Sequence, residues 1–359
     1  MTTSNSISRR NFIGKAAITA GAASLGHETL FGKPAGLTPT PYQHVRGERI
    51  QERLPREVCI ATVSQQGISA DSSEKMAQLI LAIIGKTIPY RPDVICLPEV
   101  FLSHNYANIR ETKTFPEQVE TQTELLKQFM TFARNNHCYL IFPMLTSENG
   151  KFFNSAILID RQGNRAGVYR KIQLPDGELQ MGLTPGLLYP PVFKTDFGII
   201  GIQICYDINW NDQWKALRQQ GAEIIFWPSA FAAGQTLNGR AWQNKVVVVS
   251  STNKDTSKIC DISGEVIAKT GRWDLNLICG TVNLEKAFLH TWPFVQRFDE
   301  IRSKYGPKVS ITNYHEEEWS IIESRSPDVR VKDILDEYEI RTYEQLITDS
   351  EIKNMKARG

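Results

Sequence analysis

Three residues of this chain, Glu99, Lys171 and Cys205, have side chains that together could carry out nucleophilic chemistry. A cysteine thiol is a modest nucleophile until it loses its proton, so it needs a nearby base and gains from a nearby positive charge. Glu99 is the candidate general base, and Lys171 is the candidate cation that stabilises the oxyanion formed when a carbonyl carbon is attacked. The backbone N–H of Tyr206 is a second candidate donor to that oxyanion. These residue types predict attack of a thiol on a carbonyl carbon.

Cys205 stands apart from the other cysteines of the chain. Those five lie in apolar runs, without a Cys-x-x-Cys pair: Cys59, Cys96, Cys138, Cys260 and Cys279. The usual role of such a cysteine is that of a small buried hydrophobe. Because the cysteines lack the spacing of metal ligands, we expect neither a metal site nor a cofactor.

Each of the three reactive residues follows a predicted buried strand. From Arg56 onward, short β-branched runs alternate with amphipathic helical stretches, which is typical of stacked α and β layers. The strands that precede Glu99, Lys171 and Cys205 are predicted over residues 93–97, 165–170 and 199–204. Charged side chains placed directly after buried strands tend to be functional. We therefore expect the three residues to converge at one rim of an α/β fold.

The remaining elements fit the same layered pattern. Strands are predicted over residues 57–64, 139–145, 152–160, 192–197, 223–227, 246–251, 259–262, 266–270 and 277–282. Helices are predicted over residues 72–86, 117–136 and 212–219. Beyond Leu284 the pattern loosens into a long extension, in which only two polar helical stretches are predicted, over residues 329–338 and 343–355.

Composition and charge narrow the class of partner. The chain has 359 residues, of which 41% are hydrophobic and 22% are charged. Those are the values of a globular protein and not of a disordered one. Its 41 Lys and Arg residues against 39 Asp and Glu residues give a formal net charge of +2. Such a small charge gives no strong attraction for nucleic acid or an anionic membrane, so we expect a small-molecule substrate and no nucleic-acid partner.

The amino terminus carries a different kind of signal. Arg9-Arg10 precedes a small-residue, weakly apolar stretch over residues 13–26, and together they are similar to a twin-arginine export signal. The stretch is shorter than the roughly 20 residues that span a membrane, so we expect no stable membrane anchor. We interpret residues 1–45 as the export signal and linker of a periplasmic or otherwise exported protein. The alternative is a basic tail on a cytoplasmic protein.

Three blocks of sequence surround the reactive residues: LPEVF at 97–101, YRKIQLP at 169–175 and GIQICYD at 201–207. In residues and order they resemble the catalytic blocks of the nitrilase superfamily of carbon–nitrogen hydrolases, and the resemblance covers residues 56–284. It implies a four-layer α-β-β-α sandwich with a hydrolase domain over residues 46–284 and a C-terminal extension over residues 285–359. It also implies a homodimer or a higher homo-oligomer.

The same resemblance points to further residues. Glu178 resembles a second glutamate that many members use to position the lysine and the substrate; the alternative is a solvent-exposed loop glutamate. Arg240-Ala241-x-x-Asn244 resembles the start of a helix. Where relatives commonly have Pro-Glu after the nucleophile, this chain has Asn211-Asp212, which predicts an altered substrate pocket. Candidate aromatic residues for that pocket, with burial in the core as the alternative, are Tyr206, Trp210, Trp227 and Phe231.

The residues after the nucleophile favour one reaction. Cys205-Tyr206-Asp207 resembles the amidase branch, whereas nitrilases more often have Trp-Glu there. Carbamoylases favour an arginine soon after the cysteine, and Ile208-Asn209 provides none. The resemblance therefore implies hydrolysis of a non-peptide C–N bond of a small carboxamide through a thioester on Cys205, with release of ammonia or an amine. The alternatives are a nitrilase, an N-carbamoyl amide hydrolase and a catalytically inactive binding protein with the same fold.

Overall fold

The structure is a computed structural model, which describes residues 53–103, 113–271 and 276–359. All described residues belong to one compact unit. The predicted export segment lies outside the described residues. Export, cellular location and the homo-oligomer therefore stay predictions. Within the described ranges, no helix has both the length and the apolar character needed to cross a membrane.

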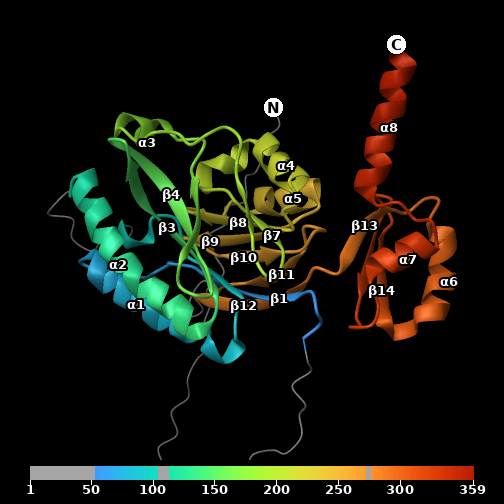
Figure 1. Ribbon diagram of the computed structural model, residues 1–359, viewed down its shortest axis with the longest axis horizontal. Helices are drawn as coiled ribbons and strands as arrows, with labels where there is room; N and C mark the ends of the chain where they lie inside the picture. Colours follow the sequence, from blue (N-terminus) through green and yellow to red (C-terminus); the bar gives the residue numbers. More distant parts are fainter. Residues whose placement is uncertain (1–52, 104–112, 272–275) are drawn as a thin grey trace, which may run out of the picture. The chain divides into compact units, whose positions relative to one another are not determined.

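The first sheet has six strands in the order β12-β1-β2-β3-β4-β5. Their bounds are Glu57–Val63 (β1), Val94–Cys96 (β2), Tyr139–Glu148 (β3), Lys151–Ile159 (β4), Arg165–Arg170 (β5) and Leu277–Asn283 (β12). β1, β2 and β3 run parallel to one another, and the other neighbouring pairs are antiparallel. Helices α1 (Ser73–Gly85) and α2 (Phe115–Asn136) lie between the parallel strands in sequence and cover the outer face of this sheet (Figure 1).

The second sheet has six strands in the order β11-β10-β9-β8-β7-β6. Their bounds are Val192–Lys194 (β6), Ile199–Ile202 (β7), Ile224–Ser229 (β8), Val247–Thr252 (β9), Lys258–Cys260 (β10) and Val266–Lys269 (β11). β7, β8 and β9 run parallel. Helices α4 (Asn211–Gln219) and α5 (Gln235–Asn244) cover its outer face, where Trp214 and Leu237 share a buried cluster with Trp227 of β8.

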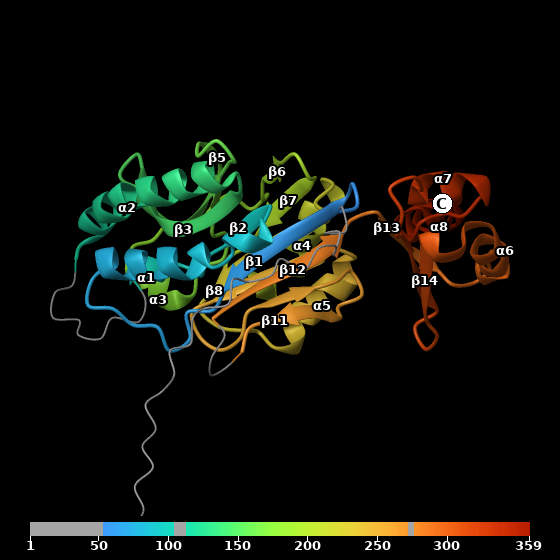
Figure 2. The ribbon, with the colours of Figure 1, turned by 90° about the horizontal axis from the view of Figure 1, so that it is seen from below.

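Side chains that alternate along the strands build the core between the sheets. In β1, Val58 and Ile60 belong to the cluster between the two sheets, whereas Ala61 and Val63 belong to the cluster under α1 and α2. The inner cluster also contains Ile202 of the second sheet. Because successive strand residues point to opposite faces, both faces of each sheet can be buried. The predicted four-layer α-β-β-α sandwich is confirmed, with helices outside both sheets (Figure 2).

Short helices occupy several connections: η1 (Ile88–Tyr90), η2 (Phe101–Ser103), α3 (Asp176–Gln180), η3 (Cys205–Asn209) and η4 (Gly306–Lys308). The prediction that a helix starts at Arg240 is wrong, because α5 begins at Gln235. Its N-cap is Gly234, which offers no side-chain hydrogen bond and so gave no capping signal in the sequence. The helix ends at Asn244, because the C-cap Lys245 has a left-handed φ of +51° that cannot continue it.

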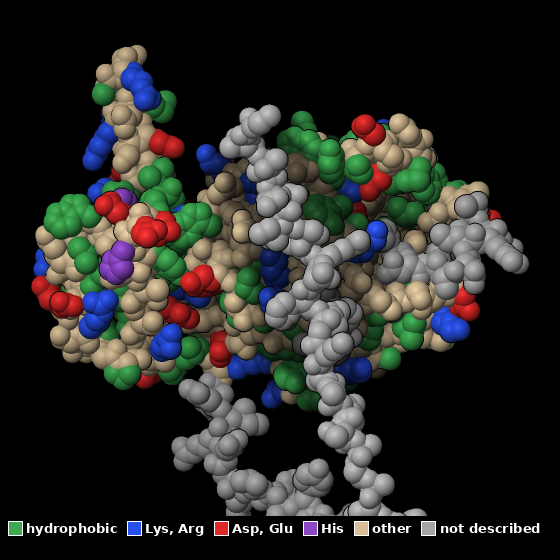
Figure 3. All heavy atoms as spheres, turned by 180° about the vertical axis from the view of Figure 1, so that it is seen from behind, with side chains coloured by type: hydrophobic (Ala, Val, Ile, Leu, Met, Phe, Trp, Pro, Cys, Tyr) green, Lys and Arg blue, Asp and Glu red, His purple; other side chains and the backbone are tan. Residues whose placement is uncertain are grey.

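The C-terminal extension is more structured than the sequence predicts. It contains the antiparallel strands β13 (Lys286–His290), β15 (Trp319–Ser324) and β14 (Val309–Tyr314), in that spatial order, and helices α6 (Val295–Tyr305), α7 (Val331–Glu337) and α8 (Tyr343–Arg358). The two predicted helical stretches are confirmed as α7 and α8, whereas the sheet and α6 were not predicted. Leu289, Phe298 and Ile322 belong to its own buried cluster. On the face seen in Figure 3, basic and acidic side chains intermingle, in keeping with the small net charge.

Candidate active site

Glu99, Lys171 and Cys205 all lie just beyond the ends of strands. Glu99 follows β2 and Lys171 follows β5, and these two strands run in the same direction within the first sheet. Cys205 follows β7 of the second sheet and is the first residue of η3. The prediction that each reactive residue follows a strand is therefore confirmed, and both sheets contribute to the site.

A buried cluster of charges surrounds Lys171. Its Nζ atom lies 2.9 Å from Oε1 of Glu99 and 2.6 Å from Oε1 of Glu178, which α3 supplies. Lys171 is 1% exposed and Glu99 is 2% exposed. Asn154 on β4 donates a 2.8 Å hydrogen bond from Nδ2 to the same oxygen of Glu99. Glu178 thus contacts the lysine and is not a solvent-exposed loop side chain.

The charges of this cluster decide the protonation of Lys171. Burial opposes the ammonium form, but the negative charges of Glu99, of Cys205 once it is a thiolate, and of Glu178 together favour it more strongly, so the pKa of Lys171 lies above its usual value. Burial raises the pKa of Glu178, and Lys171 partly offsets that rise. Lys171 is therefore a fixed cation at neutral pH, which is the property that oxyanion stabilisation requires.

Cys205 has an unusual backbone conformation. Its φ of +45° lies in the left-handed region that residues with a Cβ atom seldom adopt. Val100, next to Glu99, has a φ of +35°, which is rarer still for a β-branched residue. The indole Nε1 of Trp227 donates a 3.0 Å hydrogen bond to the carbonyl oxygen of Cys205. Backbone strain concentrates at functional sites, and here it falls on the candidate nucleophile and beside the candidate base.

The thiol of Cys205 is neutral in the resting site. Burial and the negative charge of Glu99 raise its pKa to about 12, although Lys171, the backbone of Ala230 and the side chain of Ser229 act in the opposite direction. Cys205 thus lies close enough to Glu99 and Lys171 for their charges to shift the pKa of its thiol. From the sequence we expect the cation to favour a thiolate, and here burial outweighs that effect. The proton must therefore leave as the substrate is attacked, and it needs a base in the site.

Two asparagines that the sequence analysis did not single out support the site. The carbonyl oxygen of Asn154 accepts a 2.8 Å hydrogen bond from the backbone N–H of Lys171. Asn253 donates a 2.9 Å hydrogen bond from Nδ2 to the carbonyl oxygen of Glu99. Both asparagines are buried. The signal that could have identified Asn154 is its position in the mostly apolar run FFNSAILI, because a buried polar group needs a partner.

The candidate substrate-binding aromatic residues fall into two groups. Tyr206, Trp210 and Phe231 are 38%, 38% and 42% exposed, so their rings are open to a ligand. The rings of Tyr206 and Trp210 meet edge to face with centroids 5.2 Å apart. Trp227 is fully buried, where it contacts Phe231 and the Cys205 carbonyl oxygen. The core interpretation fits Trp227, and the other three stay candidates for the pocket.

The other cysteines differ from Cys205 in their neighbours. Four are buried, as predicted, namely Cys59, Cys96, Cys138 and Cys260. Cys279 is partly exposed, which the sequence did not predict. Burial raises the pKa of Cys138 and Cys260 to about 11 and that of Cys279 to about 12. In the part of the chain that the structure describes, no three His, Cys, Asp or Glu side chains are grouped so that they could hold a metal ion.

Proteins of known name are similar to this chain in sequence. The chain is 27% identical over 225 residues to the nitrilase and fragile histidine triad fusion protein NitFhit of Drosophila melanogaster, covering 58% of this chain and 48% of that protein. It is 32% identical over 148 residues to a deaminated glutathione amidase of Synechocystis sp., covering 37% and 54%. It is 28% identical over 248 residues to the omega-amidase NIT2-B of Xenopus laevis, covering 61% and 85%. The chain thus spans about half the length of the first two relatives.

Solved structures share the fold. A carbon–nitrogen hydrolase from Helicobacter pylori G27 superposes with a TM-score of 0.57 at 19% identity, covering 70% of this chain and 93% of that chain. An amidase from Nesterenkonia sp. superposes with a TM-score of 0.56 at 17% identity, covering 69% and 96%. Residues 60–288 match the carbon–nitrogen hydrolase family, and this range contains Glu99, Lys171 and Cys205. Since the match covers the greater part of the chain, this protein belongs to the carbon–nitrogen hydrolase family.

Proposed function

We propose that this protein hydrolyses the C–N bond of a small, non-peptide carboxamide through a thioester on Cys205 and releases ammonia or an amine. The observation that carries the proposal is the buried position of Lys171 between Glu99 and Glu178, beside the Cys205 thiol. A base, a fixed cation and a nucleophile in one buried site are the groups that acyl transfer requires. The relatives named as amidases also support a carboxamide as the substrate.

In the first half of the reaction, Glu99 accepts the thiol proton while the Cys205 sulfur attacks the carbonyl carbon. The carbonyl oxygen becomes an oxyanion, which the Lys171 ammonium and the Tyr206 backbone N–H stabilise. Protonated Glu99 then gives its proton to the amide nitrogen, the C–N bond breaks, and ammonia or an amine leaves. The acyl group remains on Cys205 as a thioester.

In the second half, water replaces the amine. Glu99, again a carboxylate, accepts a proton from water as the water oxygen attacks the thioester carbonyl carbon. The C–S bond breaks, the sulfur of Cys205 takes the proton from Glu99, and the carboxylic acid is released. Glu178 exchanges no proton in this scheme. Its contact with Lys171 keeps the ammonium charged and in place.

An amide suits this site better than a nitrile. The amide oxygen becomes negative beside Lys171, whereas a linear nitrile develops charge on nitrogen and must be protonated there on the way to the thioimidate. The test compares kcat/KM for ammonia release from paired carboxamides and nitriles, with N-carbamoyl compounds as a third series. We expect the carboxamides to react fastest. Faster turnover of the nitriles, or of the N-carbamoyl compounds, across the panel would replace the amidase proposal by the corresponding alternative.

The nucleophile is tested by the mass of the intact protein after incubation with amides, where we expect an acyl adduct on Cys205. Cys205→Ala should fold normally and lose essentially all turnover. Cys279→Ala removes the other partly exposed thiol among the described cysteines and should retain turnover. Wild-type turnover in Cys205→Ala contradicts the mechanism. A wild-type protein that forms no adduct and turns over none of the three series is the result expected of an inactive binding protein.

A further inference from the structure

A buried carboxylate that the proposed reaction does not use lies two residues after the nucleophile. Asp207 is fully buried in η3. Its Oδ2 accepts hydrogen bonds from the Tyr169 hydroxyl at 2.7 Å and from the backbone N–H of Ile204 at 2.8 Å. Its Oδ1 accepts a 2.7 Å hydrogen bond from the backbone N–H of Gln173. Three donors thus converge on one carboxylate.

The three donors belong to the two segments that carry the reactive groups. Tyr169 and Gln173 lie two residues before and two residues after Lys171, and Ile204 directly precedes Cys205. These segments come from different sheets, since β5 leads to the lysine and β7 leads to the cysteine. Asp207 therefore joins the end of one sheet to the end of the other next to the site.

The surroundings of Asp207 suit a fixed anion and not a proton carrier. Burial raises its pKa to about 6, against the effect of its three hydrogen bonds, so the side chain is ionised at neutral pH. Both carboxylate oxygens already accept hydrogen bonds from the protein. Its backbone carbonyl oxygen also accepts a 3.3 Å hydrogen bond from Nε1 of Trp214, which fixes η3 against α4. No solvent or substrate can reach the carboxylate.

We propose that Asp207 is a positioning residue that sets the place of Lys171 relative to Cys205, an inference that rests on the function proposed above. The ammonium stabilises the oxyanion only if it lies within hydrogen-bond reach of the carbonyl that the sulfur attacks. A displacement of about 1 Å in such a site can reduce the rate about 10²-fold. A carboxylate that binds both segments by charge-assisted hydrogen bonds limits that displacement.

Asp207→Asn is the direct test, because the amide nitrogen faces donors where the carboxylate oxygen accepted them. We expect kcat to fall about 10²-fold while KM stays within about threefold, at a temperature where circular dichroism shows the variant folded. The alkylation of Cys205 by iodoacetamide, followed by peptide mass spectrometry, should slow about tenfold because the base no longer meets the thiol in the right geometry. That second measurement needs no substrate.

Asp93→Asn is the matched control. Asp93 accepts hydrogen bonds from Arg53, Arg161 and the backbone N–H of Cys59, and it precedes β2, at the opposite end of that strand from Glu99. The Asp93→Asn substitution should lower the free energy of unfolding and leave kcat and the rate of Cys205 alkylation per folded molecule unchanged. If Asp207→Asn behaves in the same way, Asp207 has only a structural role and the proposal is wrong.

Tyr169→Phe keeps the test decisive if Asp207→Asn does not fold. It removes one of the three hydrogen bonds to Asp207, and with it the 3.1 Å bond from Gln203 Nε2 to the tyrosine oxygen. We expect kcat to fall about tenfold with little change in KM. A kcat within about twofold of wild type overturns the proposal.

If wild-type protein cleaves no amide but Asp207→Asn still slows alkylation, the proposed function fails and the positioning role stands.

Discussion

Two buried lysines of this protein, Lys171 and Lys245, show how neighbours decide what a buried cation does. They are 1% and 7% exposed, so burial differs little between them. Lys171 lies between the carboxylates of Glu99 and Glu178. Lys245 lies among aromatic rings, with Nζ at 4.3 Å from the Trp242 centroid, 4.4 Å from Phe288, 5.2 Å from Tyr343 and 5.4 Å from Trp319. One cation has charged partners, whereas the other has π faces and the backbone carbonyl oxygen of Trp242, to which its Nζ donates a hydrogen bond.

The two environments move the lysine pKa in opposite directions. Burial opposes the charge at both sites, but at Lys171 the negative charges of its neighbours, the carboxylates above all, outweigh it and raise the pKa. At Lys245 burial lowers the pKa to about 8, and the more distant Glu344 offsets only part of that effect. A catalytic cation must stay charged throughout turnover, so it needs ionised partners. A structural lysine can be held by aromatic contacts and the packing of its methylene stem.

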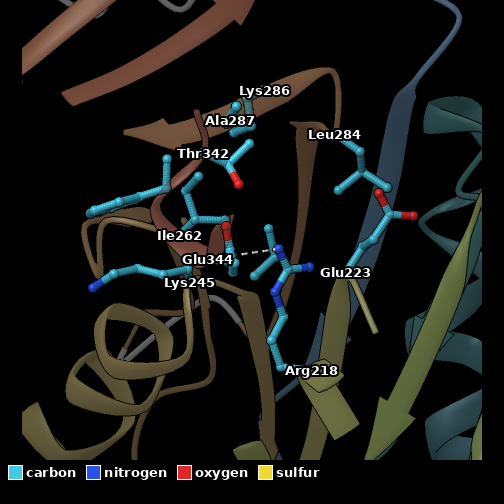
Figure 4. Close-up of a pocket in the computed structure, with 11 residues that line it drawn as sticks. Arg218, Glu223, Lys245, Ile262, Leu284, Lys286, Ala287, Thr342 and Glu344 are labelled. Carbon is cyan, nitrogen blue, oxygen red and sulfur yellow. Dashed lines mark hydrogen bonds and ion pairs between the residues drawn. The ribbon is translucent and has the colours of Figure 1, made fainter. Parts of the chain in front are cut away.

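The two lysines also join different parts of the protein. Lys171 lies where the two sheets meet the site, whereas the rings around Lys245 include Phe288, Trp319 and Tyr343 of the C-terminal extension. Next to Lys245 is a cavity of about 130 Å³, in which Arg218 and Glu344 form a 2.9 Å ion pair (Figure 4). In Figure 4 the Lys245 ammonium points away from that ion pair. The rings around Lys245 and two ion pairs, Arg218–Glu344 and Lys286–Asp261, thus connect the extension to the second sheet and to the helix α4 that covers it.

Replacing each lysine by methionine tests this comparison most strongly. Lys171→Met should lower kcat/KM by about 10³-fold, because it removes the charge opposite the oxyanion. Lys245→Met, measured with the same amide, should keep kcat/KM within about threefold, since substitutions at separate sites act independently. Similar losses in the two variants would mean that the two buried lysines do not differ in function.

Glu178 beside Lys171 and Glu344 near Lys245 should also differ in their effect on kcat, by a smaller factor than the two lysines. Glu178→Gln keeps the shape of the side chain and removes a charge that holds Lys171, so kcat should fall about 10-fold to 100-fold. Glu344→Gln removes the partner of Arg218 near Lys245 and should leave kcat unchanged. The measurement is kcat at saturating amide for both variants. Equal kcat in Glu178→Gln and wild type would show that the charge of Glu178 does not contribute to catalysis.

The catalytic region could be predicted from the sequence because its signals are local. Lys171 directly follows a strand and lies within YRKIQLP, and Cys205 and Glu99 lie in similar short blocks. The buried strands and amphipathic helices around them also follow from residue patterns. The contact of Glu178 with Lys171 needed the structure, because it depends on how the short helix α3 turns back.

The region around Lys245 could not be predicted because its partners lie far apart in the chain. Phe288, Trp319 and Tyr343 meet the lysine only after the extension has formed its own sheet. The strand β14 gives little signal in the sequence, since only one of its six residues is buried and four are partly buried. Short, half-buried strands lack the regular alternation that identifies longer ones.

The stability of the extension provides a third test. Lys245→Ala should lower the free energy of unfolding in urea by about 2–4 kcal/mol, because it removes both the ammonium and the stem that the rings enclose. Lys245→Met keeps most of that packing and should lose less. Lys332→Ala, on an exposed lysine of α7, should change the free energy of unfolding by no more than about 0.5 kcal/mol. Equal effects of Lys245→Ala and Lys332→Ala would show that the rings contribute nothing measurable.

The protonation of Lys245 gives the finest test. Its pKa is about 8 in the fold against an ordinary value of 10.5, so between these values the unfolded chain binds more protons than the folded one. The free energy of unfolding should then rise with pH, by at most about 1.4 kcal/mol per pH unit. Lys245→Met removes this contribution, so the difference in slope between wild type and variant from pH 8 to pH 10 measures Lys245 alone.

Comparing the slope of wild type with that of Lys245→Met shows whether burial or the favourable contacts dominate the protonation of Lys245. A steeper rise in wild type than in Lys245→Met means that burial dominates and that the lysine loses its proton inside the fold. Coincident slopes mean that the rings and the Trp242 carbonyl oxygen together hold the ammonium strongly enough to cancel the effect of burial. Lys171 must behave in the opposite way, because its folded pKa is raised. Its contribution to stability is complete below the ordinary lysine pKa and is lost only as the pH rises above it.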